Sequence, residues 1–389
     1  MKCLRFLSGL LLFISSITVA QSRTVPKPSA ASFLITNNDL PPKTAATSGT
    51  VFTFASDGTP QNPFHVSLGG SGAGGGYFNS NRVSVLRSSA CAYLSLGGAG
   101  EIGGVDLQAL RDIGNFPGSA TDVGIDNGIG LVNNGTYLYA SYSSSNTIAT
   151  FAILPGCSLN FLGDISPLGK NSGNVKGMAV HGNLFVVTYG DGSIESFNVS
   201  AGIPVSNGDL QNATGYAHSS FPAGVEITAD SHFAIFGDQS SSTTIEVSDI
   251  SSGKLTKTVL YNLGAAGDSA SIYLSPDETL LYITNTSVGR VSAAFFNATT
   301  GKVSRGCISK PLKGFDRNWV FLSNPVTELN TGTGSVLYLA EYGASSGIAV
   351  LNVTSSGATC SLSETAASPV TDPDSTTLLS IGVYPPRKF

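Results

Sequence analysis

The residues of this chain that could carry chemistry lie in loops, and two of these loops stand out. His218 lies in YAHSSFP, and a histidine titrates near neutral pH, which would suit a general base. Arg317 and Trp319 lie in KPLKGFDRNW, which gathers charge in a chain with only 12% charged residues. Arginine can bind a carboxylate or phosphate bidentately, and tryptophan offers an apolar face to a ring. The alternatives are a solvated loop for His218 and a surface ion pair with Asp316 for Arg317.

Other motifs for chemistry are weak. Asp122, Asp126 and Asn127 are oxygen donors, but their spacing does not match an EF-hand calcium loop. The glycine-rich stretch 69–78 resembles a phosphate cradle, yet no helix is expected after it, so a connector is the better interpretation. No Gly-x-Ser-x-Gly nucleophile elbow on a strand–helix turn is expected, because no helices are predicted. We therefore expect no metal ion and no cofactor.

The elements that must position these loops are short strands. Residues 268–306 contain four apolar runs, SASIYL, TLLYITN, RVSAAFFN and KVSRG, separated by Pro, Gly, Asn and Asp. Four strands in about 40 residues, recurring along a chain, are typical of a propeller blade. We predict an all-β, seven-bladed β-propeller over residues 33–389. Its predicted blades are 33–70 with 375–389, 82–116, 121–166, 174–212, 222–264, 268–308 and 318–367.

The two ends of the predicted propeller complete one blade. The first unit starts at Phe33 and lacks the run that matches SASIYL. SIGVYPP near the C-terminus overlays SIYLSPD, with Ile381 on Ile272 and Pro385 on Pro276. A C-terminal strand that completes the first blade would close the ring and leave no exposed sheet edge.

Loops that lead into inner strands gather on one face of a propeller, around the mouth of the central channel. The loop of Arg317 and Trp319 is of this kind, and the alternative for Trp319 is packing between blades. Matching loops supply further predicted ligand contacts, namely Tyr216, Asp268, Arg82 and Lys176, with Tyr77, Phe78 and Asp122 as neighbours. The other histidines, His65, His181 and His232, are interpreted as surface or turn residues.

Several repeats resemble the YVTN-type, lactonase-like β-propellers, such as the 6-phosphogluconolactonase-like proteins. The matching stretches are YITN at 282–285, LITN at 34–37, SPD at 275–277 and NATTG at 297–301. The resemblance implies the propeller fold over about 350 residues. Its lactonase branch is similar in carrying a His-Pro-His-type motif before one central blade and an Asp-Leu-Gly-x-Asp turn within it. Here 220–222 is Ser-Phe-Pro, and only Gly237 and Asp238 match the turn.

These departures favour an exported binding or scaffold protein that uses loops at the channel mouth. The alternative is a lactonase-type hydrolase acting on a sugar or related lactone, with His218 and Arg317 at the channel mouth. A cell-surface adhesion module is a third possibility. The expected partner is a small molecule, a glycan or a protein. A net charge of −5 without a Lys/Arg cluster argues against nucleic acid.

The N-terminal residues predict export. Residues 1–20 combine Lys2 and Arg5 with an apolar stretch that ends in Thr-Val-Ala, as in a signal peptide cleaved near Ala20. A membrane anchor is the alternative, but the stretch is short and interrupted by serines. Residues 21–32 are predicted to form a polar, flexible N-terminal lead. We expect a secreted, monomeric protein, extracellular or periplasmic, without a membrane span.

Four cysteines follow the predicted signal peptide, which allows three disulfide connectivities. Cys91 and Cys157 fall on adjacent predicted blades, as do Cys307 and Cys360, so we predict Cys91–Cys157 and Cys307–Cys360. Six Asn-x-Ser/Thr sequons also occur, and they matter if the host glycosylates secreted proteins. The six are Asn134, Asn198, Asn212, Asn285, Asn297 and Asn352.

Overall fold

The fold is known from a computed structural model. The structure describes most of the chain after its first 31 residues. The described ranges are 32–38, 46–73, 81–119, 128–213, 224–238, 244–264, 267–269, 271–314, 326–330, 335–341, 347–374 and 380–386. No helix in these ranges is long and apolar enough to cross a bilayer.

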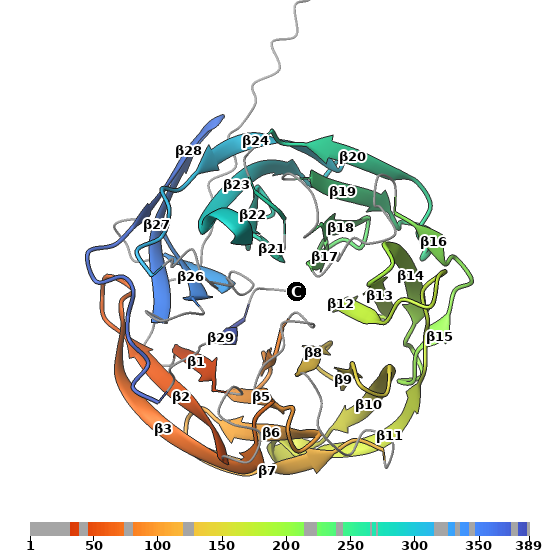
Figure 1. The fold of residues 1–389 in the computed structure, drawn as a ribbon, viewed down its shortest axis with the longest axis vertical. Coiled ribbons are helices and arrows are strands. Elements are labelled where there is room, and N and C mark those ends of the chain that lie inside the picture. The colour runs from red at the N-terminus through yellow and green to blue at the C-terminus, as the bar shows by residue number, and fades with distance from the viewer. Residues whose placement is uncertain are drawn as a thin grey trace, which may run out of the picture.

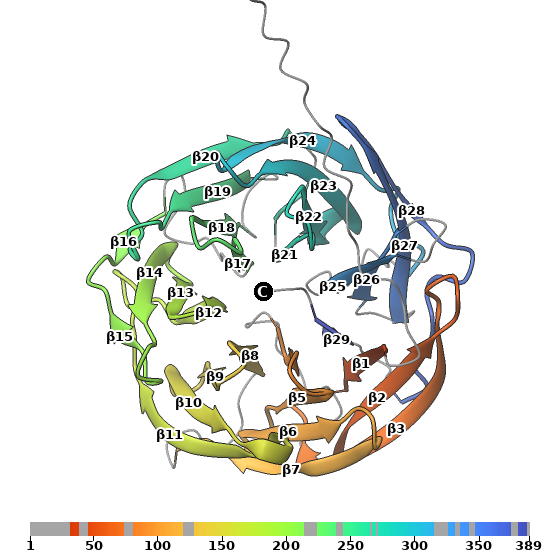
Figure 2. The same ribbon diagram turned by 180° about the vertical axis from the view of Figure 1, so that it is seen from behind.

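Seven antiparallel sheets form a ring around a central channel, which confirms the predicted seven-bladed propeller (Figure 1; Figure 2 shows the reverse side). Each sheet runs radially, with one strand nearest the centre and the others following outward to the periphery. Six sheets have four strands, and that of blade 4 has five, because two short strands pair with the same neighbour.

The strands of the first four blades, from the channel outward, are as follows. Blade 1 has β29 (Ser380–Tyr384), β1 (Phe33–Asn37), β2 (Ala46–Phe54) and β3 (Pro60–Ser71); blade 2 has β4 (Val83–Leu86), β5 (Cys91–Leu96), β6 (Glu101–Asp106) and β7 (Arg111–Pro117); blade 3 has β8 (Ile129–Asn133), β9 (Tyr137–Tyr142), β10 (Thr147–Ile153) and β11 (Leu159–Ile165); blade 4 has β12 (Val175–His181), β13 (Leu184–Tyr189), β14 (Ser193–Asn198), β15 (Val205–Ser206) and β16 (Gln211–Asn212).

The remaining blades follow the same order. Blade 5 has β17 (Val225–Ile227), β18 (Phe233–Gly237), β19 (Thr244–Asp249) and β20 (Thr258–Asn262); blade 6 has β21 (Ser271–Leu274), β22 (Leu280–Asn285), β23 (Arg290–Asn297) and β24 (Lys302–Ile308); blade 7 has β25 (Val326–Asn330), β26 (Ser335–Glu341), β27 (Gly347–Ser356) and β28 (Thr359–Glu364). Two single-turn 3-10 segments, η1 (Pro155–Cys157) and η2 (Thr286–Val288), connect strands.

The inner strand of blade 7 differs from the predicted one. The sequence pattern favours residues 318–324, which lie outside the described residues. The strand that pairs with β26 is β25, and its register places Val326 opposite Tyr338 and Asn330 opposite Ser335. The short connection between Asn330 and Ser335 sets this register, because a hairpin pairs the residues that flank its turn.

The ring closes as predicted, because β29 pairs along its full length with β1. The register runs antiparallel from Phe33 opposite Tyr384 to Asn37 opposite Ser380. The segment before β29 adds hydrogen bonds across the junction. Asp372 accepts from the hydroxyl groups of Thr36 at 2.6 Å and Thr50 at 2.8 Å. The C-terminal segment therefore holds the first and last blades together through backbone and side chains.

The core consists of seven apolar clusters, one at each junction between neighbouring blades. Tyr139 of blade 3, for example, stacks on Phe185 of blade 4 with ring centroids 4.8 Å apart. Tyr338 of blade 7 is fully buried and packs with Leu34 and Ile381 of blade 1. Each blade thus buries both faces only when its two neighbours are present, as expected for a repeat protein.

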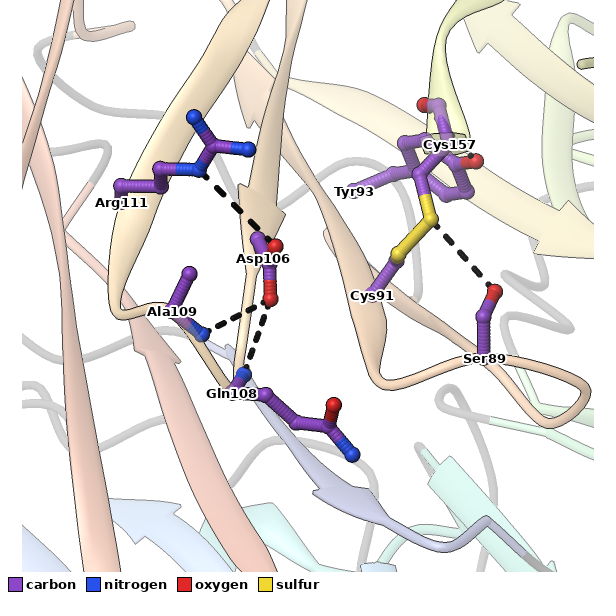
Figure 3. Close-up of a disulfide and its surroundings, with 8 residues drawn as sticks. All are labelled: Ser89, Cys91, Tyr93, Asp106, Gln108, Ala109, Arg111 and Cys157. Atoms are coloured by element: carbon purple, nitrogen blue, oxygen red, sulfur yellow. Dashed lines mark hydrogen bonds and ion pairs between the residues drawn. A yellow bond between two sulfur atoms is a disulfide. The ribbon is translucent and has the colours of Figure 1, made fainter. Parts of the chain in front are cut away.

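Both predicted disulfides are present, and each joins two neighbouring blades. Cys91–Cys157 links β5 of blade 2 to η1 of blade 3, where the Tyr93 hydroxyl donates to the Cys157 carbonyl at 3.2 Å (Figure 3). Cys307–Cys360 links β24 of blade 6 to β28 of blade 7. The closed loops span 66 and 53 residues. Each bond would therefore lower the entropy of the unfolded chain, which raises its free energy by roughly 4 kcal/mol at room temperature.

Candidate functional site

The inner strands surround a cavity of about 500 Å³ in the central channel. Its described lining comes from β29, β4, β8, β12, β17 and β21, the inner strands of blades 1 to 6. Ligand sites of small organic molecules typically occupy roughly 300–1,000 Å³. The cavity therefore has room for one such molecule.

Most of the wall is apolar, because each of the six inner strands contributes aliphatic residues to it. Examples are Val83, Leu131, Met178, Val225, Ile272 and Ile381, one from each of the six blades. Many of these side chains also belong to the clusters between blades, so the wall is continuous with the core. A wall built on a packed core keeps its shape without a ligand.

An arginine, a histidine and a glutamate interrupt the apolar wall. Arg87 directly follows β4, His181 ends β12, and Glu226 lies in the middle of β17. The inner strands run in the same direction around the ring, so Arg87 and His181 both lie toward the end of the channel where these strands finish. A cation and a histidine near one end of an apolar cavity would suit a ligand with an apolar body and an anionic or hydrogen-bonding group.

Asparagine side chains fix this end of the cavity by joining neighbouring blades. The Asn133 amide of blade 3 donates to Ser84 Oγ at 2.7 Å and to the Val85 carbonyl at 3.1 Å in blade 2. The Asn134 amide donates to the Gly182 carbonyl of blade 4 at 3.1 Å. Blades 2, 3 and 4 are therefore linked where Arg87 and His181 reach the cavity.

Arg82 is one of the predicted contacts that the structure describes, and it is buried between blades 2 and 3. Its side chain is 2% exposed. A Cβ atom on Gly128 would lie 2.3 Å from the guanidinium carbon, so the arginine lies directly against this glycine. Gly128 also has a φ of +106°, which disfavours any other residue there. Arg82 therefore belongs to the packing contact between blades 2 and 3.

Lys176 and Asp268 lie at or before the starts of inner strands. Burial lowers the pKa of Lys176, whose aliphatic chain packs over Gly190. Burial raises the pKa of Asp268, although its carboxylate accepts hydrogen bonds from the Ser287 backbone at 2.9 Å and hydroxyl at 3.1 Å. Neither residue, nor Arg82, is among the described residues that line the cavity.

The other predicted site residues lie outside the described residues and stay predictions. They are His218, Arg317, Trp319 and Tyr216, with Tyr77, Phe78 and Asp122. The same holds for Asp126 and Asn127. Among the residues that the structure does describe, no group of His, Cys, Asp and Glu side chains could hold a metal ion.

Gly237 and Asp238 match the lactonase turn. In this structure they make backbone contacts within blade 5 and with blade 6. The Gly237 N–H donates to the Gly224 carbonyl at 3.0 Å, and a Cβ atom at Gly237 would lie 2.5 Å from the Ser269 carbonyl oxygen. Asp238 is 2% exposed, and its backbone carbonyl accepts from Ser269 N–H at 2.8 Å. Close contact between blades 5 and 6 accounts for the glycine.

His181 and Glu341 are two residues of interest that sequence reasoning missed. His181 was interpreted as a surface or turn residue, yet it lines the cavity. Glu341 ends β26 and is fully buried. Burial, and then the neighbouring Glu364 carboxylate, raise the pKa of Glu341 to about 8, against the opposing effects of Gly314 N–H and Lys313. A lone acidic residue after the apolar run SVLYLA was the available signal.

Comparison with known proteins places the chain by fold. No family model and no curated protein matches it. A structure described as a putative 6-phosphogluconolactonase from Bacteroides uniformis is 15% identical, covering 91% of this chain and 99% of that one with a TM-score of 0.67. A second such protein, from Bacteroides fragilis, is 16% identical, covering 92% and 99% with a TM-score of 0.62.

A periplasmic gluconolactonase from Pseudomonas aeruginosa is also similar, at 12% identity over 70% of this chain and 80% of that one with a TM-score of 0.55. The chain is thus a seven-bladed β-propeller with the fold of the 6-phosphogluconolactonase-like proteins. At these identities the likeness concerns the fold, so a function has to be argued from this chain's own residues.

Proposed function

We propose that this protein binds a small organic molecule in its central channel. The observation that carries the proposal is the cavity of about 500 Å³, whose largely apolar wall comes from six blades. The apolar body of the ligand would lie against the inner strands, and its polar group would lie toward Arg87 and His181. A pre-formed apolar cavity with a few polar groups is the usual form of a small-molecule site.

The opposite end of the channel would add further contacts. Arg317, Trp319 and Tyr216 are proposed to contact the ligand from the loops that lead into the inner strands. The proposed setting is outside the cytoplasm, following the predicted signal peptide, with the protein acting as a monomer. The two disulfides support this setting, because disulfides persist in oxidising compartments.

A fluorinated fragment library, screened by ligand-observed NMR against the secreted chain, tests the proposal. We expect hits with an apolar body and one carboxylate or hydrogen-bonding group. Arg87→Ala and His181→Ala should weaken the carboxylate-bearing hits more than neutral ones, because a charge-assisted hydrogen bond is lost. Absence of hits, or hits that ignore both substitutions, would contradict the proposal.

The same protein should be tested on lactones, since two similar structures are described as putative 6-phosphogluconolactonases and one as a gluconolactonase. We expect sugar lactones to show no turnover above that of buffer. Turnover that disappears in His181→Ala or His218→Ala would replace binding by hydrolysis as the function.

A further inference from the structure

Two of the six sequon asparagines occupy equivalent places on the outer part of the ring. Asn198 is the last residue of β14, the third strand of blade 4, and Asn297 is the last residue of β23, the third strand of blade 6. Both are exposed where the chain turns toward the periphery of its blade. Both lie outside the cavity lining.

The side chains of Asn198 and Asn297 share one conformation. The Asn198 oxygen Oδ1 accepts from the backbone N–H of Ser200 at 2.9 Å. The Asn297 oxygen Oδ1 accepts from the N–H of Thr299 at 3.0 Å. In each case the partner is the hydroxyl residue of the sequon itself, so a local turn fixes the carboxamide. Within the described residues, neither Nδ2 atom donates a hydrogen bond, so it stays accessible for modification.

Two other sequons are used differently by the fold. Asn285 is fully buried, and its Nδ2 donates to Ser292 Oγ at 2.8 Å. The Nδ2 of Asn134 donates to the Gly182 carbonyl, near the end of the channel where the inner strands finish. A glycan on Asn285 would place a hydrated sugar inside the protein and break that hydrogen bond. Folded protein should therefore carry no glycan at Asn285.

We propose that Asn198 and Asn297 are N-glycosylation sites when the chain passes through a secretory pathway with an oligosaccharyl transferase. The co-substrate is a lipid-diphosphate-linked oligosaccharide. A bond forms between Asn Nδ2 and the anomeric carbon, the bond from that carbon to the phosphate oxygen breaks, and the lipid diphosphate leaves while Nδ2 loses one proton. The proposal is independent of what the channel binds.

A glycan at Asn198 would also protect an exposed sheet edge. Asn198 pairs with Val205 of the edge strand β15, and Val205 is 62% exposed. Unprotected edge strands can pair with other chains, and a bulky polar group beside them prevents this. The sugar would therefore improve solubility beside the exposed edge strand β15.

Translation of the full chain with microsomes tests the proposal. We expect protease-protected product whose gel mobility shifts back by one glycan step in Asn198→Gln and by one in Asn297→Gln. Ser200→Ala should have the same effect as Asn198→Gln, whereas Ser200→Thr, which retains the sequon, should keep the glycan. Peptide mapping after enzymatic deglycosylation in heavy-oxygen water should label Asn198 and Asn297 and leave Asn285 unlabelled.

Two outcomes would overturn the proposal. The chain could enter the microsomes and carry no glycan at Asn198 and Asn297, or it could carry one at Asn285 as often as at Asn198. The Ser200→Ala and Ser200→Thr pair separates lost glycosylation from lost folding, because both variants leave the asparagine unchanged.

Discussion

At the scale of single residues, Glu341 is a buried carboxyl whose raised pKa should make folding stability depend on pH. It is fully buried at the end of β26, near Glu364. A carboxyl whose pKa rises from 4.5 to about 8 on folding holds its proton in the folded state at a pH where the unfolded chain has lost it. Folding stability should therefore fall as the pH rises through this window.

Replacing Glu341 with glutamine removes this titration. We expect Glu341→Gln to gain stability relative to the wild type between pH 5 and pH 8, by on the order of 1–3 kcal/mol. Urea unfolding at several pH values measures the difference. Asp164→Asn removes an exposed carboxylate and is the matched control. A difference that stays constant with pH for Glu341→Gln would show that Glu341 is ionised in the fold.

At the scale of elements, the strand that closes the ring should matter more than its length suggests. β29 pairs with β1 and contributes Ile381 and Val383 to the cluster between blades 7 and 1. A chain that ends at Asp374 would leave the inner edge of β1 unpaired and expose apolar side chains of two blades.

We expect truncation after Asp374 to cause aggregation or loss of cooperative unfolding, measured by size-exclusion chromatography and thermal melting. Truncation after Pro386 keeps all of β29 and is the control, expected to behave like the full chain. A monomeric, cooperatively unfolding protein without β29 would contradict the role given to ring closure.

The elements were the most predictable part of the molecule. The four apolar runs of 268–306 became β21 to β24, and the overlay of Ile381 on Ile272 located β29, because strand period and turn residues are local properties of the sequence. Blade 7 was harder, since the register of β25 depends on a hairpin and not on the apolar run before it.

The cavity was less predictable than the fold. His181 and Arg87 lie more than 90 residues apart in the sequence, and only the closed ring brings both to one cavity. The sequence pattern predicts ligand contacts only from the loops that lead into the inner strands. The cavity also has ionisable residues near the opposite ends of those strands, where single residues such as His181 carry no local motif.

At the scale of the whole molecule, the ring has two different surfaces. Its channel offers a shaped, mostly apolar cavity, and its periphery offers turns and edge strands with exposed sequons. Disulfides join blades 2 and 3 and blades 6 and 7. Such a scaffold keeps the inner strands in place while loops vary, which is how one fold serves many functions.

Filling the channel tests the central claim most directly. Ala179→Trp and Val180→Trp place a large side chain at the cavity wall of blade 4, whereas Val205→Trp adds the same side chain on the exposed edge of that blade. The measurement is the dissociation constant of the best fragment for each variant, after thermal melting has shown that it is folded. We expect both channel variants to weaken binding by at least about tenfold, or 1.4 kcal/mol, and Val205→Trp to leave it unchanged. Equal affinity in all three variants would show that the ligand binds elsewhere and would contradict the account.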